Sequence, residues 1–395
     1  SRSSSKSCKV RHLNNLSFLL EKLLSDLLDY KKSGVDVEKT DDFASNLPNL
    51  LKSTWSPSVL NNFGAFASYF ELPTSQEFKN PVLAEDGFTY EESHLKKWIK
   101  QKKNDVKIGV LGCMATNFKT DLLENKSLKI DFIAGPDSYK TLPGLLRGLE
   151  ETQEKQFDVT LSEFETYSDI YPMREKGVNA WIAVMRGCNN YCSFCVVPFT
   201  RGRERSRSPE SVVEEVKKLV ADGYKQVTLL GQNVNSYKSE ENDFTELMRQ
   251  VSDVKGMERI FFTSPHPKDF PTKLLKLMAE RENICNQVHM PLQAGNNRVL
   301  EMMNRTYTKE EFLSLIDETR RLIPNVVITT DIIVGFPTET EDEFQDTLDV
   351  VEKAEFDSAF TFKYSERKAG KGAPSTLAAK RYPDDITEEV KKDRV

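Results

Sequence analysis

The chain from about residue 106 onward alternates short apolar runs rich in β-branched residues with longer amphipathic runs of helical period. The apolar runs predict strands at 107–111, 129–133, 180–185, 226–230, 259–263, 286–290, 326–334 and 358–362. The amphipathic runs predict helices at about 209–222, 243–253, 272–281, 309–322 and 340–354. Strands that alternate with helices form a parallel sheet with right-handed crossovers, so this part of the chain is predicted to be α/β.

The stretch from about 180 to 363 supplies six of these strands. Six strands are enough for an open barrel but not for a closed barrel of eight. In such α/β units the functional groups gather at the carboxyl ends of the strands. Residues that directly follow a predicted strand are therefore the first candidates for a site.

The first hundred residues have a different pattern. Leucines at steps of three and four between 16 and 28 predict a small helical segment within 1–65, for which the sequence indicates no function. Between 69 and 104, Pro81 and the Asp86-Gly87 turn enclose a short extended piece at 82–84. Thr89 is a candidate N-cap for a helix that carries Leu95, Trp98 and Ile99 on one face.

Composition excludes several classes of protein. The length of 395 residues allows two or three domains. The net charge of −6 and a pI of about 5.6 exclude a broadly basic nucleic-acid binder, although they allow a local basic patch. With a mean hydropathy of −0.52 and no apolar run near the ~18 residues of a membrane span, no membrane segment is expected.

The compartment stays undecided between cytoplasm and mitochondrion. The opening residues SRSSSKSCKVRH are basic and rich in serine, as organelle transit peptides are, but acidic residues soon follow.

Three of the six cysteines, Cys188, Cys192 and Cys195, fall within eight positions directly after the predicted strand 180–185. Thiolates favour zinc or iron–sulfur clusters. A 4Fe–4S cube held by three cysteines keeps one iron open for another ligand, such as a substrate or cofactor. The alternatives are a zinc site completed by His266 or His289, and a group of buried thiols without a ligand.

The CxxxCxxC spacing after a first strand resembles the radical S-adenosylmethionine (SAM) superfamily. Further segments resemble one branch, the tRNA methylthiotransferases, most closely those that act on N6-isopentenyladenosine in the anticodon loop. These segments are IGVLGCMA (108–115), IAGPDSYKTLPGLL (133–146), WIAVMRGCNNYCSFCVVPFTRGRERSR (181–207), VTLLGQNVNSY (227–237), FTSPHPKDF (262–270), HMPLQAGNNRVLEMMNR (289–305) and TTDIIVGFPTETEDEF (329–344).

The resemblance implies a fold, cofactors and a reaction. The fold is an open (β/α)6 partial TIM barrel of radical SAM type. A 4Fe–4S cluster on the cysteine triplet binds SAM at its open iron, an electron donor reduces it, and SAM cleavage yields a 5′-deoxyadenosyl radical. The complete reaction places a methylthio group at C2 of the tRNA adenosine.

The resemblance also implies site residues, each with loop ordering as the alternative role. Phe194 is expected near the adenine of SAM, and Asn233 and Asp331 near its ribose or methionine part. The remaining candidates are Gly231 and Gln232, which follow the strand 226–230, and His289 and Gln293, which could line the cavity or cap a strand end.

Arginines at 201, 203, 205 and 207, with Glu204 among them, give a local charge of +3 in an acidic protein. Arg201, Arg203 and Arg205 are candidates for contact with tRNA phosphates or with the SAM carboxylate, because Arg forks suit both. The alternative is a solvated charged loop.

The chain departs from the family pattern before residue 106 and at its end. The family's N-terminal domain supplies three cysteines to an auxiliary 4Fe–4S cluster, and here Cys113 alone matches, as the third of them. No segment resembles the family's C-terminal RNA-binding β-barrel domain. We therefore predict a helical segment at 1–65, a partial U-box-like segment at 66–105, a truncated methylthiotransferase domain at 106–165 and a radical SAM core at 175–395. Such a chain would at most cleave SAM.

Residues 69–104 resemble the first half of a U-box, a ubiquitin-ligase module. The match lies in Asn80-Pro81-Val82, in 86–91 and in the helix through Trp98. A second hypothesis is therefore a ubiquitin-pathway protein that binds a conjugating enzyme through Pro81, Tyr90 and Trp98. A third is an inactive remnant. The junction at 104–106 is either a real fusion or a gene-model error.

Overall fold

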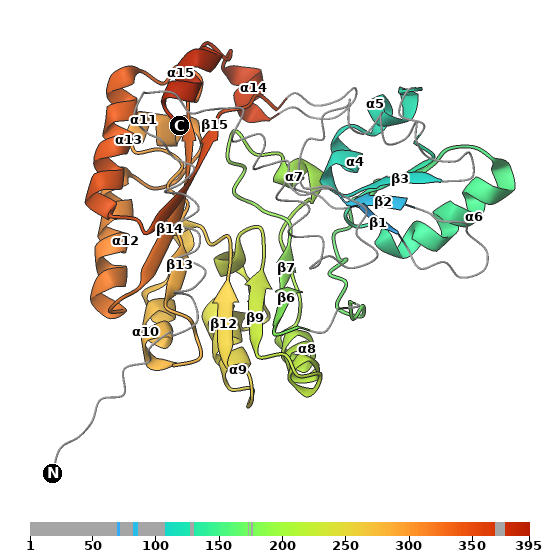
Figure 1. Cartoon of the computed structure of the whole chain (residues 1–395), viewed down its shortest axis with the longest axis horizontal. Helices are drawn as coiled ribbons and strands as arrows, with labels where there is room; N and C mark the ends of the chain where they lie inside the picture. Colours follow the sequence, from blue (N-terminus) through green and yellow to red (C-terminus); the bar gives the residue numbers. More distant parts are fainter. Residues whose placement is uncertain are drawn as a thin grey trace, which may run out of the picture.

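The computed structural model describes residues 69–71, 82–85, 107–126, 130–172, 174, 177–367 and 376–395. They form a smaller N-terminal α/β unit and a larger barrel-like unit, which lie side by side (Figure 1). No helix in these ranges has the length and apolarity that crossing a membrane requires.

The N-terminal unit is built on one sheet of five strands in the order β1-β2-β3-β4-β5. The strands are β1 (Tyr69–Glu71), β2 (Val82–Glu85), β3 (Ile108–Leu111), β4 (Phe132–Ala134) and β5 (Gln156–Asp158). β1 pairs antiparallel with β2, and all other neighbours are parallel. Apolar residues cover both faces of β3 and β4, as is usual for parallel strands between helices.

The pairing of β2 bears on the expected U-box half. Val82, Leu83 and Ala84 are an extended piece, as predicted, but they pair with Ile108, Gly109 and Val110 of β3. These residues are thus an inner strand of the same sheet as β3–β5. The described strands give the U-box resemblance, and the ubiquitin partner that depends on it, no support. The predicted helical segment at 1–65 and the residues Pro81, Tyr90 and Trp98 lie outside the described residues.

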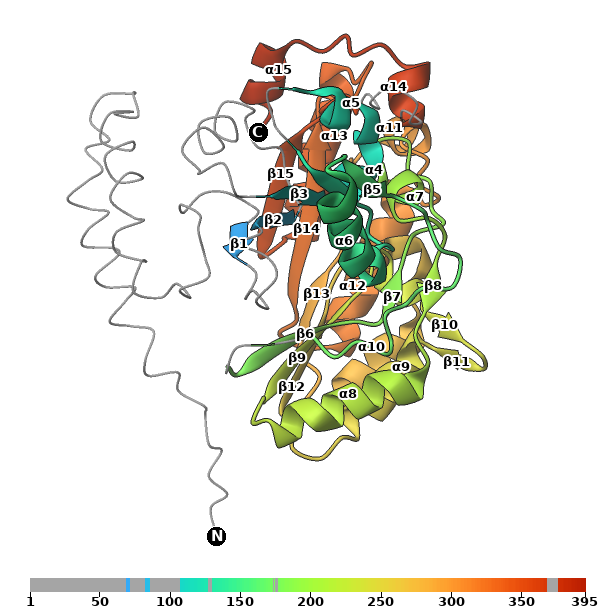
Figure 2. The ribbon, with the colours of Figure 1, turned by 90° about the vertical axis from the view of Figure 1, so that its right-hand side faces the viewer.

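Helices cover the N-terminal sheet on both faces. They are α4 (Cys113–Asn117), α5 (Lys119–Glu124) and α6 (Leu142–Thr152), with a 3-10 turn, η3 (Tyr139–Thr141), before α6. Ala115 joins a core on one face, and Leu149 of α6 packs with Leu111 and Phe132 on the other. Figure 2 shows α6 lying across this sheet.

The larger unit confirms the open α/β barrel. Its strands are β6 (Asn179–Ala183), β9 (Gln226–Leu230), β12 (Arg259–Phe262), β13 (Gln287–His289), β14 (Val327–Val334) and β15 (Ser358–Lys363). All pair in parallel, as two three-stranded sheets in the orders β6-β9-β12 and β13-β14-β15. A parallel bridge between Ile260 and Ile284 joins the two sheets. β6 and β15 are the free edges of the barrel.

Helices lie along the outer side of the strands (Figure 1). They are α8 (Pro209–Ala221), α9 (Phe244–Ser252), α10 (Thr272–Glu280), α11 (Asn297–Met302), α12 (Lys309–Leu322) and α13 (Glu341–Ala354). Two short helices, α14 (Leu377–Arg381) and α15 (Glu388–Asp393), lie beyond the carboxyl end of β15. Their start signals are local: Ser208 caps α8, and Thr308 with Glu311 forms a capping box on α12. Short elements complete the unit: β7 (Met185–Arg186), β8 (Arg205–Ser206), β10 (Lys238–Ser239), β11 (Asn242–Asp243), α7 (Val197–Thr200), η4 (Val234–Ser236) and η5 (Pro267–Asp269).

The two faces of β14 define the inside of the barrel. Ile332 and Val334 are buried against Phe344 and Val351 of α13, so they face outward to the helices. Asp331 and the other alternate residues therefore face the lumen. The parallel pairing with the edge strand β15 places Phe360 opposite Asp331, so Phe360 also faces the lumen.

Candidate functional site

The cysteine triplet lies on a loop at the carboxyl end of the first barrel strand. The loop leaves β7 at Gly187 and ends in α7, and the antiparallel pairing of β7 with β8 closes it. Gly187 has a φ of +78°, and a Cβ at this position would lie 2.0 Å from the carbonyl oxygen of Arg203. Only glycine fits this turn, which brings the backbone of 202–203 against the start of the loop.

Hydrogen bonds from other elements fix this loop. The Gly187 N–H donates to Oε1 of Gln232 at 2.7 Å, and the Cys188 N–H donates to the Gly202 carbonyl at 3.2 Å. Glu204 accepts hydrogen bonds from the Asn189 N–H at 3.1 Å and from Nδ2 of Asn233 at 3.5 Å. The side chains of Gln232 and Asn233 thus contact the loop and its neighbour Glu204.

Residues at the end of α11 and just after it bind the far side of the loop. The Ser193 N–H donates to the Met303 carbonyl, and its hydroxyl donates to the Met302 carbonyl at 2.7 Å. Asn304 donates to the carbonyls of Asn190 and Tyr191. Nη1 of Arg305 lies 3.4 Å from the sulfur of Cys192. Sequence reasoning missed these residues, and their only signal was their place in the segment 289–305 that resembles the family.

The three thiols are free and sit in a poorly solvated place. Cys188 is buried, and Cys192 and Cys195 are half-buried. Burial raises the pKa of Cys188 to about 11 and that of Cys195 to about 12. The thiols of Cys188 and Cys195 are therefore protonated at neutral pH, and binding a metal has to release their protons.

The donor set suits an iron–sulfur cube. Three soft sulfur ligands on one loop can each bind a separate iron. In the described part of the chain, no three His, Cys, Asp or Glu side chains converge as ligands of a single metal ion do. A cube does not need such convergence, because its three cysteines bind three different atoms. The residues present fit the cluster.

Other predicted residues meet in the lumen near this end. Nε2 of His289 lies 3.1 Å from Oδ2 of Asp331, and Nδ1 of His289 lies 2.9 Å from the Thr329 hydroxyl. Gln293 has a φ of +69°, and its N–H donates to the carbonyl of Asp331 at 2.8 Å. His289 also contacts the ring of Phe360 on β15.

Phe194 and Gly231 make packing contacts with other residues of the barrel. Phe194 is half-buried and packs against the barrel core. Gly231 lies so close to Met185 that a Cβ would meet its side chain at 2.6 Å. Whether Phe194, Gly231, Gln232, Asn233 and Asp331 contact SAM stays a prediction.

The four arginines that follow the triplet have different partners. Arg205 is buried, and its Nη2 lies 2.9 Å from both carboxylate oxygens of Asp137 in the N-terminal unit. Arg207 is also buried and binds Glu215 at 2.6 Å. Arg203 is exposed. The guanidinium of Arg205 is held in this internal ion pair, and whether it also meets phosphate or the SAM carboxylate stays a prediction.

Arg201 links the loop to the one cysteine that matches the auxiliary set. Its Nε donates to the sulfur of Cys113 at 3.1 Å, across the contact between α4 and α7. Cys113 is the first residue of α4 and lies at the interface of the two units. Cys285 lies apart, in the turn before β13.

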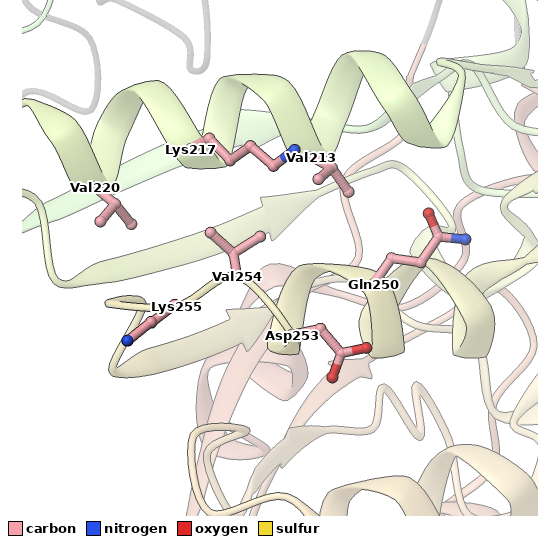
Figure 3. A pocket seen from close by; sticks show the side chains of 7 residues that line it. All are labelled: Val213, Lys217, Val220, Gln250, Asp253, Val254 and Lys255. Atoms are coloured by element: carbon pink, nitrogen blue, oxygen red, sulfur yellow. The ribbon is translucent and has the colours of Figure 1, made fainter.

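A hollow on the outer surface is separate from this site. It lies between α8 and α9 and is lined by Val213, Lys217, Val220, Gln250, Asp253, Val254 and Lys255 (Figure 3). Its lining includes the turn that leads to the start of β12, at the amino end of the strands. The cysteine loop lies at the opposite, carboxyl end.

Comparisons with known proteins agree on one family. The radical SAM superfamily model matches residues 182–351. The tRNA-2-methylthio-N6-dimethylallyladenosine synthases of Christiangramia forsetii and Phocaeicola vulgatus are 44% and 46% identical, over 75% and 74% of this chain. The chain covers 64% and 63% of their lengths, so it spans less than two thirds of these relatives.

Solved structures show the same fold. The radical SAM methyltransferase TsrM from Kitasatospora setae, with cobalamin and a 4Fe–4S cluster bound, superposes with a TM-score of 0.56. It covers 73% of this chain and 62% of its own, at 16% sequence identity. At this identity the likeness concerns the fold alone.

Proposed function

Because the chain belongs to the radical SAM superfamily and is homologous to tRNA-2-methylthio-N6-dimethylallyladenosine synthases, we propose that it is the catalytic core of a tRNA methylthiotransferase. Its substrate is an N6-isopentenyladenosine of the tRNA anticodon loop, and the position modified is C2. The cysteine loop carries the proposal, since it places three thiols at the carboxyl end of the barrel's first strand.

The protein holds the cofactors and supplies no side-chain acid or base. Cys188, Cys192 and Cys195 would hold a 4Fe–4S cluster, which when bound supplies an electron to cleave SAM. Gln232 fixes the turn at Gly187. An external low-potential donor has to provide the electron.

The lumen offers a surface for a flipped-out base. Trp181 on β6 is 60% exposed, and Phe360 and Phe362 on β15 are 56% and 46% exposed. These large aromatic side chains belong to the two free edges of the barrel, and Phe360 borders the His289–Asp331 pair. Enzymes that modify a base remove it from its stack, and aromatic side chains bind bases by stacking. An apolar N6 substituent would gain from the same contacts.

Sulfur insertion needs more than these residues provide. Besides the triplet and Cys285, the sequence contains only Cys8 and Cys113. Two cysteines cannot replace the three that the resemblance assigns to an auxiliary cluster. We therefore propose that the 395-residue chain by itself cleaves SAM but does not complete the methylthio transfer.

Anaerobic reconstitution with iron and sulfide tests this proposal. We expect about four irons per chain, as one cube requires, and formation of 5′-deoxyadenosine when dithionite and SAM are added. Prenylated tRNA added to the same mixture should stay without a methylthio group. About eight irons with methylthiolated tRNA would contradict the single-cluster proposal, and a colourless protein without 5′-deoxyadenosine would contradict the function as a whole.

A further inference from the structure

Arg305 is a buried cation beside the cysteine loop. Its side chain lies just after α11, and the residue is 8% exposed. Its Nε donates to the Tyr307 hydroxyl at 3.0 Å, its Nη2 to the Pro291 carbonyl at 2.9 Å and its Nη1 to the Cys192 sulfur at 3.4 Å. Two of these acceptors are neutral oxygen atoms, and the third is a cluster ligand.

The two other arginines that are buried among the described residues have a carboxylate partner. Arg205 binds Asp137 and Arg207 binds Glu215. Among the described residues, no carboxylate forms an ion pair with Arg305. A buried cation is costly unless an anion compensates its charge. Of the three groups that Arg305 contacts, the sulfur of Cys192 is the one that becomes anionic when it binds iron.

Tyr307 and His266 lie near Arg305, and both are uncharged. Tyr307 donates its own hydroxyl proton to the carbonyl of Leu292 at 2.8 Å and so remains a neutral partner. His266 meets the ring of Tyr307 edge-on, with 5.7 Å between ring centroids. Burial, together with the nearby charge of Arg305, lowers the pKa of His266 to about 2, so this imidazole adds no second positive charge.

We propose that Arg305 is the fixed counter-charge of the cluster held by Cys188, Cys192 and Cys195, and that it raises the reduction potential of that cluster. Charge and hydrogen bonds at the sulfurs set such potentials. On reduction, one electron enters from an external donor, no bond at Arg305 forms or breaks, and the added negative charge is stabilised by the guanidinium. The inference rests on the cluster of the proposed function.

Redox titration followed by electron paramagnetic resonance tests the inference without reference to turnover. Wild type, Arg305→Gln, Arg305→Lys and the control Arg207→Gln are reconstituted anaerobically and titrated with dithionite in the absence of SAM. For Arg305→Gln we expect the ratio of reduced to oxidised cluster at a fixed potential to fall at least tenfold, which is about 59 mV for one electron. Arg305→Lys keeps the positive charge but loses the planar guanidinium with its several N–H donors. Its midpoint potential should therefore lie between those of the wild type and Arg305→Gln.

The control separates the charge near the sulfur from general damage to the barrel. Arg207 is equally buried but binds Glu215, Ser211 and the Ala183 carbonyl. Arg207→Gln should therefore leave the midpoint of the cluster unchanged. An Arg305→Gln midpoint equal to that of the wild type would overturn the inference while the proposed function stands.

Two further results bear on the inference. If Arg305→Gln loads no iron, the midpoint potential of Arg305→Lys becomes the test, and a value at or above that of the wild type overturns the inference. If the wild type itself forms no cluster, the proposed function fails, and the inference fails with it.

Discussion

Nη2 of Arg205 lies 2.9 Å from both carboxylate oxygens of Asp137, and this pair joins the N-terminal unit to the segment that follows the cysteine loop. The Asp137 side chain is 1% exposed and that of Arg205 is 5% exposed. Nη1 of Arg205 also donates to the carbonyls of Arg201 and Arg203. Between them, Gly202 accepts the N–H of Cys188. An acid of one unit thus orders the metal-binding loop of the other.

Asp137→Asn should weaken both the fold and the metal site. The substitution leaves the buried guanidinium of Arg205 without its anion, a change that typically costs about 3–5 kcal/mol. We expect a loss of unfolding free energy of that size, measured by urea denaturation, and fewer irons per chain after reconstitution.

Glu215→Gln is the matched control for Asp137→Asn. It breaks the buried pair between Glu215 of α8 and Arg207. The side-chain hydrogen bonds of Arg207 go to Glu215, Ser211 and the Ala183 carbonyl, all outside the cysteine loop. This variant should lose stability but keep its iron at temperatures where it is folded. Equal iron content in Asp137→Asn and wild type would show that the Asp137–Arg205 pair has no role in ordering the loop.

Alanine at Cys188, Cys192 or Cys195 should abolish the cluster, because two sulfurs cannot hold three corners of a cube. Iron analysis and the visible absorption spectrum measure the loss. Cys285→Ala provides the control, since Cys285 lies in the turn before β13 and should leave both readings unchanged. Retention of a full cluster in any one of the three loop variants would refute the ligand assignment.

Exposed Arg203 is the arginine of this run to test against tRNA. Arg203→Ala should weaken binding of tRNA and reduce the salt dependence of log K by roughly one unit of slope if Arg203 meets one phosphate. Filter binding or fluorescence anisotropy at several salt concentrations measures both. Lys255→Ala, at the amino end of the barrel, should change neither. Identical results for the two variants would remove Arg203 from the interface.

The buried His266 should make stability depend on pH. Burial lowers its pKa in the fold to about 2, whereas an unfolded histidine titrates near 6.5. Below about pH 6.5 the unfolded chain therefore binds a proton that the folded chain refuses, so stability falls as the pH falls. Between about pH 7 and 5.5 this group should remove about 1 kcal/mol.

Urea denaturation at the two pH values measures this loss, and His266→Gln should abolish that share of it. Equal pH dependence in the variant and the wild type would mean that His266 does not carry the effect. The comparison is internal to each protein, so any constant loss of stability from the substitution cancels.

Local pattern predicted the barrel well. The strand at 226–230 and the helix at 309–322 have the predicted bounds, because burial on both faces marks a parallel strand and a capping box marks a helix start. The missed elements are mostly short, such as α7 and α11, where there are too few turns for a helical period to appear. The cysteine triplet was visible because its spacing is itself local.

The sequence by itself determined the strands and helices of the barrel and the trio of sulfur ligands, since period, caps and spacing act over a few residues. Only the tertiary structure decided what those ligands meet. Arg201 and Arg205 bind Cys113 and Asp137, which lie 88 and 68 positions away in the chain. Arg305 reaches Cys192 across 113 positions, and β2 enters the sheet beside β3. Such contacts depend on how the elements pack, which no short window of sequence contains.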